Sequence, residues 1–166
     1  MLRLQLIRHA KTNQMSATGK DFDRELLEKG IVQANFLGHT IAEKRLALGK
    51  ILCSSAARTQ QTASIIRQHT TQTWDIHFDP SLYLAHHMEL FAVLMEQKEA
   101  VITLIGHNEG LSDLASYIVD EHIHLRTGEL LCLHINLEKW EQLSRATATV
   151  VDRYRPEVYL PLALVK

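Results

Sequence analysis

Arginine, histidine and serine side chains follow three short apolar runs, at residues 2–7, 50–53 and 100–105. In chain order they are Arg8 and His9, then Ser54, Ser55 and Arg58, and last His107 and Asn108 after Gly106. The planar fork of an arginine suits phosphate oxygens, and a neutral imidazole is a nucleophile. If the three groups meet, they form a cationic pocket around a nucleophilic nitrogen. Such a pocket favours phosphoryl transfer, in which a protein mainly positions the reactants and stabilises charge on the phosphoryl oxygens.

The pattern of apolar residues predicts the elements that would bring these groups together. Apolar positions at helical spacing indicate a helix over 25–44, and β-branched residues make 100–105 the clearest strand. The expected strands are 2–7, 50–53, 74–78, 100–105, 130–135 and 147–153, and the expected helices are 25–44, 57–68, 86 or 87–96 and 111–119. This alternation predicts an α/β fold, a three-layer α/β/α sandwich with a mostly parallel, mixed central sheet.

The site is then expected at one edge of that sheet. Ligands of such sheets bind at the carboxyl ends of the strands, where the arginines and histidines named above stand. Helices that begin after Ser55 and Asn108 would add backbone N–H donors for an anion. Ser54 and Ser55 are available to cap the helix over 57–68.

Composition and charge limit the classes of partner. The chain has 166 residues and a formal net charge of −1, which fits one domain over 1–166 and gives no bulk attraction to nucleic acid or to an anionic membrane. No apolar run reaches the roughly 20 residues of a transmembrane helix, and no signal-peptide pattern opens the chain, so we expect a cytoplasmic protein. Cys53 and Cys132 are expected to be reduced core thiols. The residues found require no metal and no other cofactor.

Five segments together resemble a known family. In the family's order they are LIRHAKT (6–12), DFDRELLEKG (21–30), SSAARTQQTA (54–63), GHNEGLSDLA (106–115) and RTGELLCL (126–133). The chain resembles the histidine phosphatase superfamily, the phosphoglycerate mutase-like proteins. Within it, the chain is most similar to the small SixA-type phosphohistidine phosphatases. The resemblance implies a phosphoglycerate mutase-like fold and a metal-independent phosphatase.

The resemblance also implies residue roles. His9 would be the nucleophile that becomes phosphohistidine, and His107 the second pocket histidine, donating to the phosphoryl group. Arg8 and Arg58 would bind the phosphoryl oxygens. Supporting contacts to phosphate are implied for Asn108, Thr12 and Ser55.

Two features near these segments need interpretation. Asp23 and Arg24 lie in a family segment, and we interpret them mainly as a structural pair, while a neighbouring aspartate could orient a pocket residue. Ala10 stands where the family's Arg-His-Gly pattern has glycine, which is a change of one methyl group.

The expected proton donor is missing. Many superfamily members place a carboxylate shortly after the third strand, whereas residues 81–87 read SLYLAHH, with Leu84 and no carboxylate before Glu89. General acid help contributes about 10²–10⁴-fold when an alkoxide must leave. A phosphohistidine needs it less, since imidazole, with an ordinary pKa of about 6.5, can be protonated before the N–P bond breaks. Glu109, Glu129 and His86 remain candidates for the acid.

The sequence therefore predicts a two-step phosphatase with a protein phosphohistidine as substrate. The chain has little length for an enclosing lid, and an open site suits a phosphorylated protein side chain. The expected partners are a phosphorylated protein or a small phosphorylated substrate, with no nucleic acid and no membrane. The alternatives are a phosphatase for small phosphomonoesters and a catalytically silent module that binds phosphorylated protein. The apolar tail, 153–166, is expected to pack on the edge of the sheet.

Overall fold

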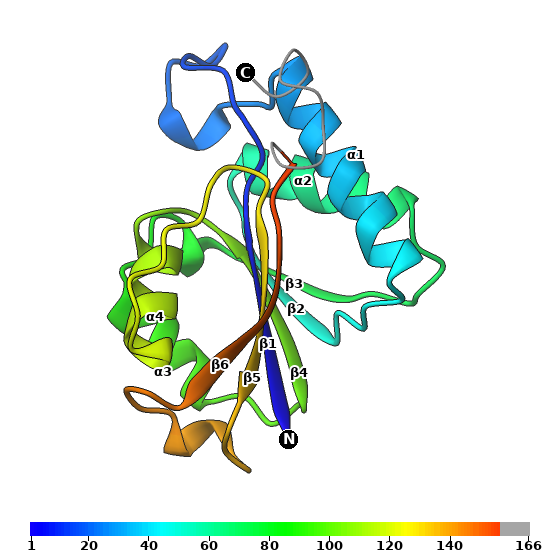
Figure 1. Ribbon diagram of the computed structural model, residues 1–166. Helices are drawn as coiled ribbons and strands as arrows, with labels where there is room; N and C mark the ends of the chain where they lie inside the picture. The colour runs from blue at the N-terminus through cyan, green and yellow to red at the C-terminus, as the bar shows by residue number, and fades with distance from the viewer. Residues whose placement is uncertain (157–166) are drawn as a thin grey trace.

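The computed structural model describes residues 1–156, which form a six-stranded sheet with helices on both faces (Figure 1). The strands lie in the order β3-β2-β4-β1-β5-β6. Their bounds are β1 Leu2–Arg8, β2 Lys50–Ser54, β3 Asp75–Asp79, β4 Val101–Gly106, β5 Leu130–Ile135 and β6 Ala148–Tyr154. The first four run parallel, and β5 runs antiparallel to both of its neighbours, β1 and β6. The predicted three-layer fold with a mostly parallel, mixed sheet is confirmed.

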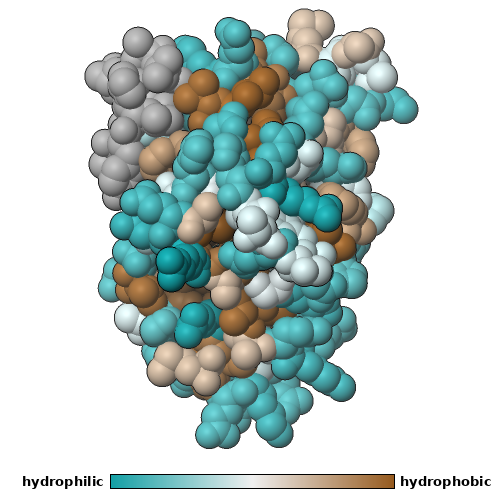
Figure 2. All heavy atoms as spheres, turned by 90° about the vertical axis from the view of Figure 1, so that its right-hand side faces the viewer, coloured by the Kyte–Doolittle hydropathy of each residue, from teal (hydrophilic) through white to brown (hydrophobic). Residues whose placement is uncertain are grey.

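Two pairs of helices cover the sheet. Helices α1 (Glu28–Glu43) and α2 (Ala57–Gln68) pack together on one face, and α3 (His87–Met95) and α4 (Gly110–Val119) pack together on the other (Figure 1). The central strands are largely buried and mostly apolar, because each face lies under a helical layer. On the outer side of the α1–α2 layer, hydrophilic and hydrophobic side chains are interspersed (Figure 2).

The segment before α1 differs from the prediction. The helix begins at Glu28 rather than at residue 25, because residues 25–27 are extended: Leu26 bridges to Thr12, and the Leu27 N–H donates to the Lys11 carbonyl at 2.9 Å. Gly30 permits this approach, since a Cβ there would lie 2.0 Å from the Lys11 carbonyl oxygen. The segment 11–27 therefore forms a loop whose two ends pair with each other beyond the carboxyl end of β1.

The cap of α2 also differs. Ala56 occupies the N-cap position with no side-chain hydrogen bond, so the prediction that Ser54 and Ser55 cap this helix is wrong. The Ser54 carbonyl instead accepts from the Thr59 hydroxyl at 2.7 Å, inside the first turn. The Ser54 hydroxyl accepts from the Ala56 N–H at 3.3 Å and makes a further contact in the site described below.

Within residues 1–156, no helix is long and apolar enough to cross a membrane. The predicted packing of the apolar tail concerns residues that lie mostly outside the described range. The two cysteines are not bonded to one another, and burial raises the pKa of each thiol to about 12.

Candidate active site

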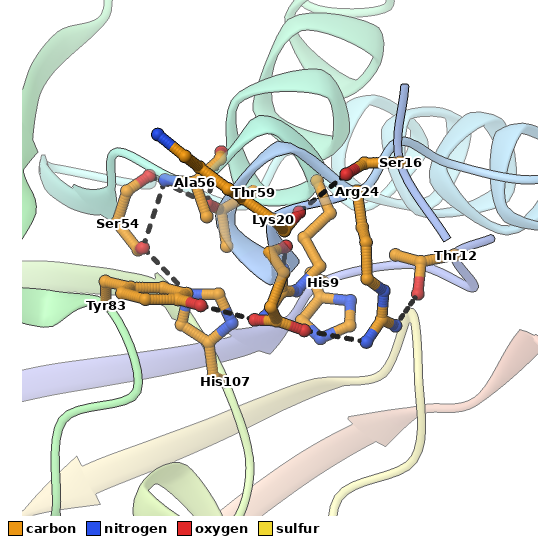
Figure 3. Close-up of polar contacts among 12 residues, drawn as sticks. His9, Thr12, Ser16, Lys20, Arg24, Ser54, Ala56, Thr59, Tyr83 and His107 are labelled. Atoms are coloured by element: carbon orange, nitrogen blue, oxygen red, sulfur yellow. Dashed lines mark hydrogen bonds and ion pairs between the residues drawn. The ribbon is translucent and has the colours of Figure 1, made fainter. Parts of the chain in front are cut away.

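Three adjacent strand ends bring the predicted residues together. Strands β2, β4 and β1 are neighbours, with Arg8 opposite Gly106 and Cys53 opposite Ile105 in register. The residues that follow these strands therefore share one edge, and the rings of His9 and His107 lie 5.3 Å apart, centroid to centroid (Figure 3). They open on a pocket of about 680 Å³. Its walls include six of the predicted site residues: Arg8, His9, Thr12, Arg58, His107 and Asn108.

His9 is held as a neutral imidazole with one free lone pair. Its Nδ1 lies 2.8 Å from the Ala10 carbonyl oxygen, which can only accept, so Nδ1 carries the proton and Nε2 has the lone pair. Burial lowers the pKa of His9 to about 3, against the opposing hydrogen bond to Ala10, and the positive charges of Arg58 and Arg8 lower it further. At neutral pH this nitrogen is therefore unprotonated and nucleophilic.

His107 has one ring nitrogen fixed and the other unused. Its Nε2 lies 2.7 Å from the Ser54 hydroxyl, whereas Nδ1 is buried with no hydrogen-bond partner. Burial, followed by the charge of Arg58, lowers the pKa of His107 to about 3. The Tyr83 ring meets the imidazole edge-on (Figure 3). Ser54 is predicted at this strand end, but the sequence indicates no role for it in the site, because its contact with His107 depends on β2 lying beside β4.

Asp21 holds Arg58 in the pocket wall. The Arg58 guanidinium donates to the Asp21 carbonyl at 2.8 Å and to its carboxylate at 3.0 Å. The Tyr83 hydroxyl also donates to this carboxylate, and Arg24 pairs with it at 2.8 Å. The hydrogen bond from Tyr83, together with Arg58, lowers the pKa of Asp21 to about 2. Asp21 is thus an anion that orients Arg58.

The interpretation of Asp23 and Arg24 as a pair is therefore wrong. Arg24 pairs with Asp21, and the Asp23 carboxylate instead accepts from the Thr18 hydroxyl at 2.5 Å. Asp21 to Asp23 form a 3-10 turn, which directs the two carboxylates to different partners. The neighbouring aspartate that the sequence allowed as an orienting residue corresponds to Asp21.

Arg8 and Asn108 share one backbone anchor. The Leu125 carbonyl accepts from Arg8 Nη1 at 2.9 Å and from Asn108 Nδ2 at 2.8 Å. The Asn108 oxygen accepts from the Ser112 hydroxyl at 2.7 Å, so this amide is held on both sides. Burial lowers the pKa of Arg8, and the carboxylates of Glu109 and Glu129 oppose that shift. Arg8 Nε is buried and has no partner.

Thr12 and Ser55 are placed differently from each other. Thr12 lines the pocket, and its hydroxyl accepts from Arg24. Ser55 is absent from the pocket wall, and its carbonyl accepts from the Gln60 side chain. The structure therefore places Thr12, but not Ser55, in the wall of the pocket.

The candidates for the proton donor are not equivalent. Leu84 lines the pocket and is 48% exposed. Glu129 is fully buried, bonded to Arg153 and Arg155 and absent from the wall, so its candidacy as a proton donor is wrong. His86 is exposed and precedes α3 as its N-cap, away from the pocket wall. Glu109 also lies outside the wall, but it is exposed and close enough to act on Arg8.

Residues 1–156 contain no group of three or more histidine, cysteine, aspartate or glutamate residues that could hold a metal ion. The groups that line the pocket are instead donors to an anion. The buried Arg58, the half-buried Arg8, two neutral imidazoles and one orienting aspartate form an arrangement that suits a phosphoryl group with a nucleophile beside it.

Comparison with known proteins shows which protein family the chain resembles. The model of the histidine phosphatase superfamily (branch 1) matches residues 4–83. An uncharacterized chloroplastic protein of Arabidopsis thaliana is 26% identical over 151 residues, which are 84% of this chain and 69% of that protein.

Solved structures show the same fold over nearly the whole chain. A protein assigned as phosphohistidine phosphatase SixA from Agrobacterium tumefaciens is 24% identical, with a TM-score of 0.81 over 93% of this chain and 98% of that chain. The protein histidine phosphatase SixA complexed with tungstate is 14% identical, with a TM-score of 0.80 over 96% and 100%. A mycobacterial glucosyl-3-phosphoglycerate phosphatase is 15% identical, with a TM-score of 0.66 over 91% and 97%.

The match to the superfamily model, together with the fold shared with solved phosphatases, defines a phosphatase with a phosphoglycerate mutase-like α/β architecture. By its match to the superfamily model over residues 4–83 the chain is similar to the histidine phosphatase superfamily, and its fold is that of the SixA proteins.

Proposed function

We propose that the chain removes phosphoryl groups from protein phosphohistidine through a phosphohistidine intermediate on His9. The observation that carries this proposal is the neutral His9, whose Nε2 is free and whose neighbours include two arginines. The pocket wall has Leu84 where a proton donor would be expected. In the first step Nε2 attacks phosphorus in line, the new N–P bond forms, and the bond to the leaving group breaks with both of its electrons. In the second step water attacks the phosphoenzyme, which releases inorganic phosphate and restores His9.

The other pocket residues act on the phosphoryl oxygens in both steps. Arg8 and Arg58 offset the negative charge on the equatorial oxygens, and Asp21 keeps the guanidinium of Arg58 oriented. His107 supplies a donor at Nδ1 once the anion raises its pKa, because that nitrogen has no other partner. Thr12 and Asn108 complete the wall.

The leaving group decides between the substrate classes. An alkyl phosphate expels an alkoxide and needs a proton at that moment, which Leu84 cannot give. A substrate imidazole can be protonated by solvent beforehand and leaves as a neutral ring. Among the structural neighbours, proteins named phosphohistidine phosphatase SixA support this substrate.

A second candidate is a phosphatase for small phosphomonoesters. Neighbours that include the glucosyl-3-phosphoglycerate phosphatase favour it. The structural feature that favours it here is Glu109, an exposed carboxylate near Arg8 that could donate a proton after a local movement. A module that only binds phosphorylated protein is the third candidate, and the free nucleophile of His9 is evidence against it.

The test compares three substrates in the presence of EDTA: a phosphohistidine-bearing protein, p-nitrophenyl phosphate and a simple alkyl phosphate. We expect fast hydrolysis of the first and slow hydrolysis of the last. The His9→Ala variant should be inactive on all three and form no phosphoenzyme, whereas His86→Ala, the matched control, should keep its activity. Comparable rates on the alkyl phosphate that fall in Glu109→Gln would establish the second candidate. Binding of phosphorylated protein without turnover would establish the third.

A further inference from the structure

One carbonyl group fixes two residues of the pocket, and it lies on the connection between α4 and β5. The Leu125 carbonyl accepts from Arg8 Nη1 and from Asn108 Nδ2, at 2.9 and 2.8 Å. Arg8 has no other hydrogen bond from its guanidinium among the described residues, and its Nε is buried and unpartnered. The direction in which Arg8 presents its remaining donors therefore depends on where Leu125 is held.

Two side chains hold the backbone on either side of Leu125. Arg153, from strand β6, donates through Nη2 to the His124 carbonyl at 2.8 Å and through Nε to the Glu129 carboxylate at 2.6 Å. The other carboxylate oxygen of Glu129 accepts from the Arg126 N–H at 2.8 Å. The residues directly before and after Leu125 are thus both bonded to this ion pair, which we name the β6 clamp, Arg153 with Glu129.

The burial of Glu129 makes the clamp a demanding arrangement. The Glu129 side chain is fully buried, whereas Arg153 is about one quarter exposed, and Arg155 adds a third contact at 3.3 Å. A buried carboxylate is costly unless its partners satisfy it with good geometry, and replacing it by an apolar core would stabilise a fold at least as well. A role beyond stability is consistent with where its bonds go, which is to the backbone that carries Leu125.

We propose that the β6 clamp positions Arg8 for phosphoryl transfer. Arg153 and Glu129 are positioning residues that do not line the pocket: they fix residues 124–126, the Leu125 carbonyl fixes the Arg8 guanidinium, and Arg8 meets the phosphoryl oxygens. The inference rests on the proposed function, since it requires that Arg8 bind the phosphoryl group. It extends that function from the pocket wall to strand β6, at the far edge of the sheet from β3.

The first variant is Arg153→Lys in the full chain, which keeps the positive charge but cannot bond to the His124 carbonyl and to Glu129 in the same fork geometry. We expect kcat/KM for p-nitrophenyl phosphate to fall about tenfold, because small displacements of a catalytic group cost one to two orders of magnitude. The matched control is Arg145→Lys, which makes the same change in an exposed arginine–carboxylate pair with Asp120 and should leave kcat/KM unchanged.

A double-mutant cycle with Arg8→Lys separates positioning from general destabilisation. If Arg153 acts through Arg8, the Arg153→Lys change should cost about tenfold in the native chain and little in the Arg8→Lys background. A merely structural role would lower activity by the same factor in both backgrounds, and that result would overturn the inference. Normal activity of Arg153→Lys alone would overturn it too.

The same cycle separates the failure of this inference from failure of the proposed function. If Arg8→Lys itself keeps full activity, no positioning of Arg8 is needed and the clamp falls, while the proposed function is decided separately by the His9→Ala variant. If Arg8→Lys is impaired and Arg153→Lys is not, only the clamp falls. Should Arg153→Lys unfold under the assay conditions, Arg155→Lys perturbs the same Glu129 carboxylate through a longer contact. A smaller loss of kcat/KM that disappears in the Arg8→Lys background is then expected, and an equal loss in both backgrounds would overturn the clamp.

Discussion

Lowering the pH from about 7.5 to about 5 is expected to destabilise the free protein, because His9 and His107 stay neutral in the folded chain. Each has an ordinary pKa of 6.5, and burial lowers it to about 3. The unfolded chain therefore binds protons at pH values where the folded chain does not. The free energy of unfolding rises with pH wherever the unfolded state holds more protons. The contribution of the two neutral histidines is therefore fully present above about pH 6.5 and is lost as the pH falls below that value.

The size of the effect follows from the same values. At about pH 5 an unfolded histidine with a pKa of 6.5 gains about 2 kcal/mol from protonation, while the folded one, with a pKa near 3, gains almost nothing. The loss at this pH hardly depends on how far below 5 the folded pKa lies. The two histidines together should lower the free energy of unfolding by about 4 kcal/mol, a large part of the 5–15 kcal/mol typical of a domain.

Urea unfolding at the two pH values, in buffers without phosphate or sulfate, measures this loss. In His9→Asn the fall in unfolding free energy should be smaller than in the native chain by about 2 kcal/mol, as calculated for one histidine. The exposed His122 provides the control, His122→Asn. A fall in His9→Asn as large as in the native chain would refute the argument that His9 is held neutral by burial and by the neighbouring arginines.

Three further predictions concern the pocket. Asp21→Asn should lower kcat/KM for p-nitrophenyl phosphate about tenfold in steady-state kinetics, since Arg58 loses a charged acceptor. The control Asp23→Asn, which affects only the bond to Thr18, should leave kcat/KM unchanged. Ser54→Ala should lower kcat by up to about tenfold through His107, while Ser55→Ala should have no effect, and equal losses would contradict the placement of Ser55 outside the wall. Sulfate, a dianion throughout this range, should bind more tightly at about pH 5.5 than at about pH 8 by calorimetry, because the bound anion raises the pKa of His107; equal affinities would contradict this.

The sheet could be predicted because its signal is local. Strand β5 and helix α2 have the predicted bounds, and the other strands differ by one residue at one end or at both ends. Apolar runs ended by charged or turn residues carry that information within a few positions. The start of α1 could not be predicted in this way. Residues 25–27 have the spacing of the helix that follows, and their extended form depends on Thr12 and Lys11, which are distant in sequence.

The site divides along the same line. Residues at strand ends could be predicted, since the order of parallel strands brings Arg8, His9 and His107 to one edge. The hydrogen-bond partners of these residues could not be predicted, because each contact joins segments whose positions in the sheet the sequence does not give. The Ser54 contact needs β2 beside β4, and the anchoring of Arg8 needs the connection before β5 to pass the carboxyl end of β1. The buried Glu129 was misjudged for the same reason, since only the fold shows that Arg153 in β6 and Arg155 just after it bond to this carboxylate.

The two arginines have opposite effects at different stages of the proposed reaction. In the empty pocket their charge adds to burial and keeps both imidazoles unprotonated, which leaves the lone pair of His9 available for attack. When a phosphoryl dianion lies between them, its charge offsets theirs, so the pKa of each histidine rises. His107 can then hold a proton at Nδ1 toward the phosphoryl oxygens, and His9 is blocked from protonation by its new bond to phosphorus. The same pocket thus favours a neutral His9 before binding and a proton-donating His107 afterwards, without a carboxylic acid. Such a pocket best suits a substrate whose leaving group takes its proton from solvent.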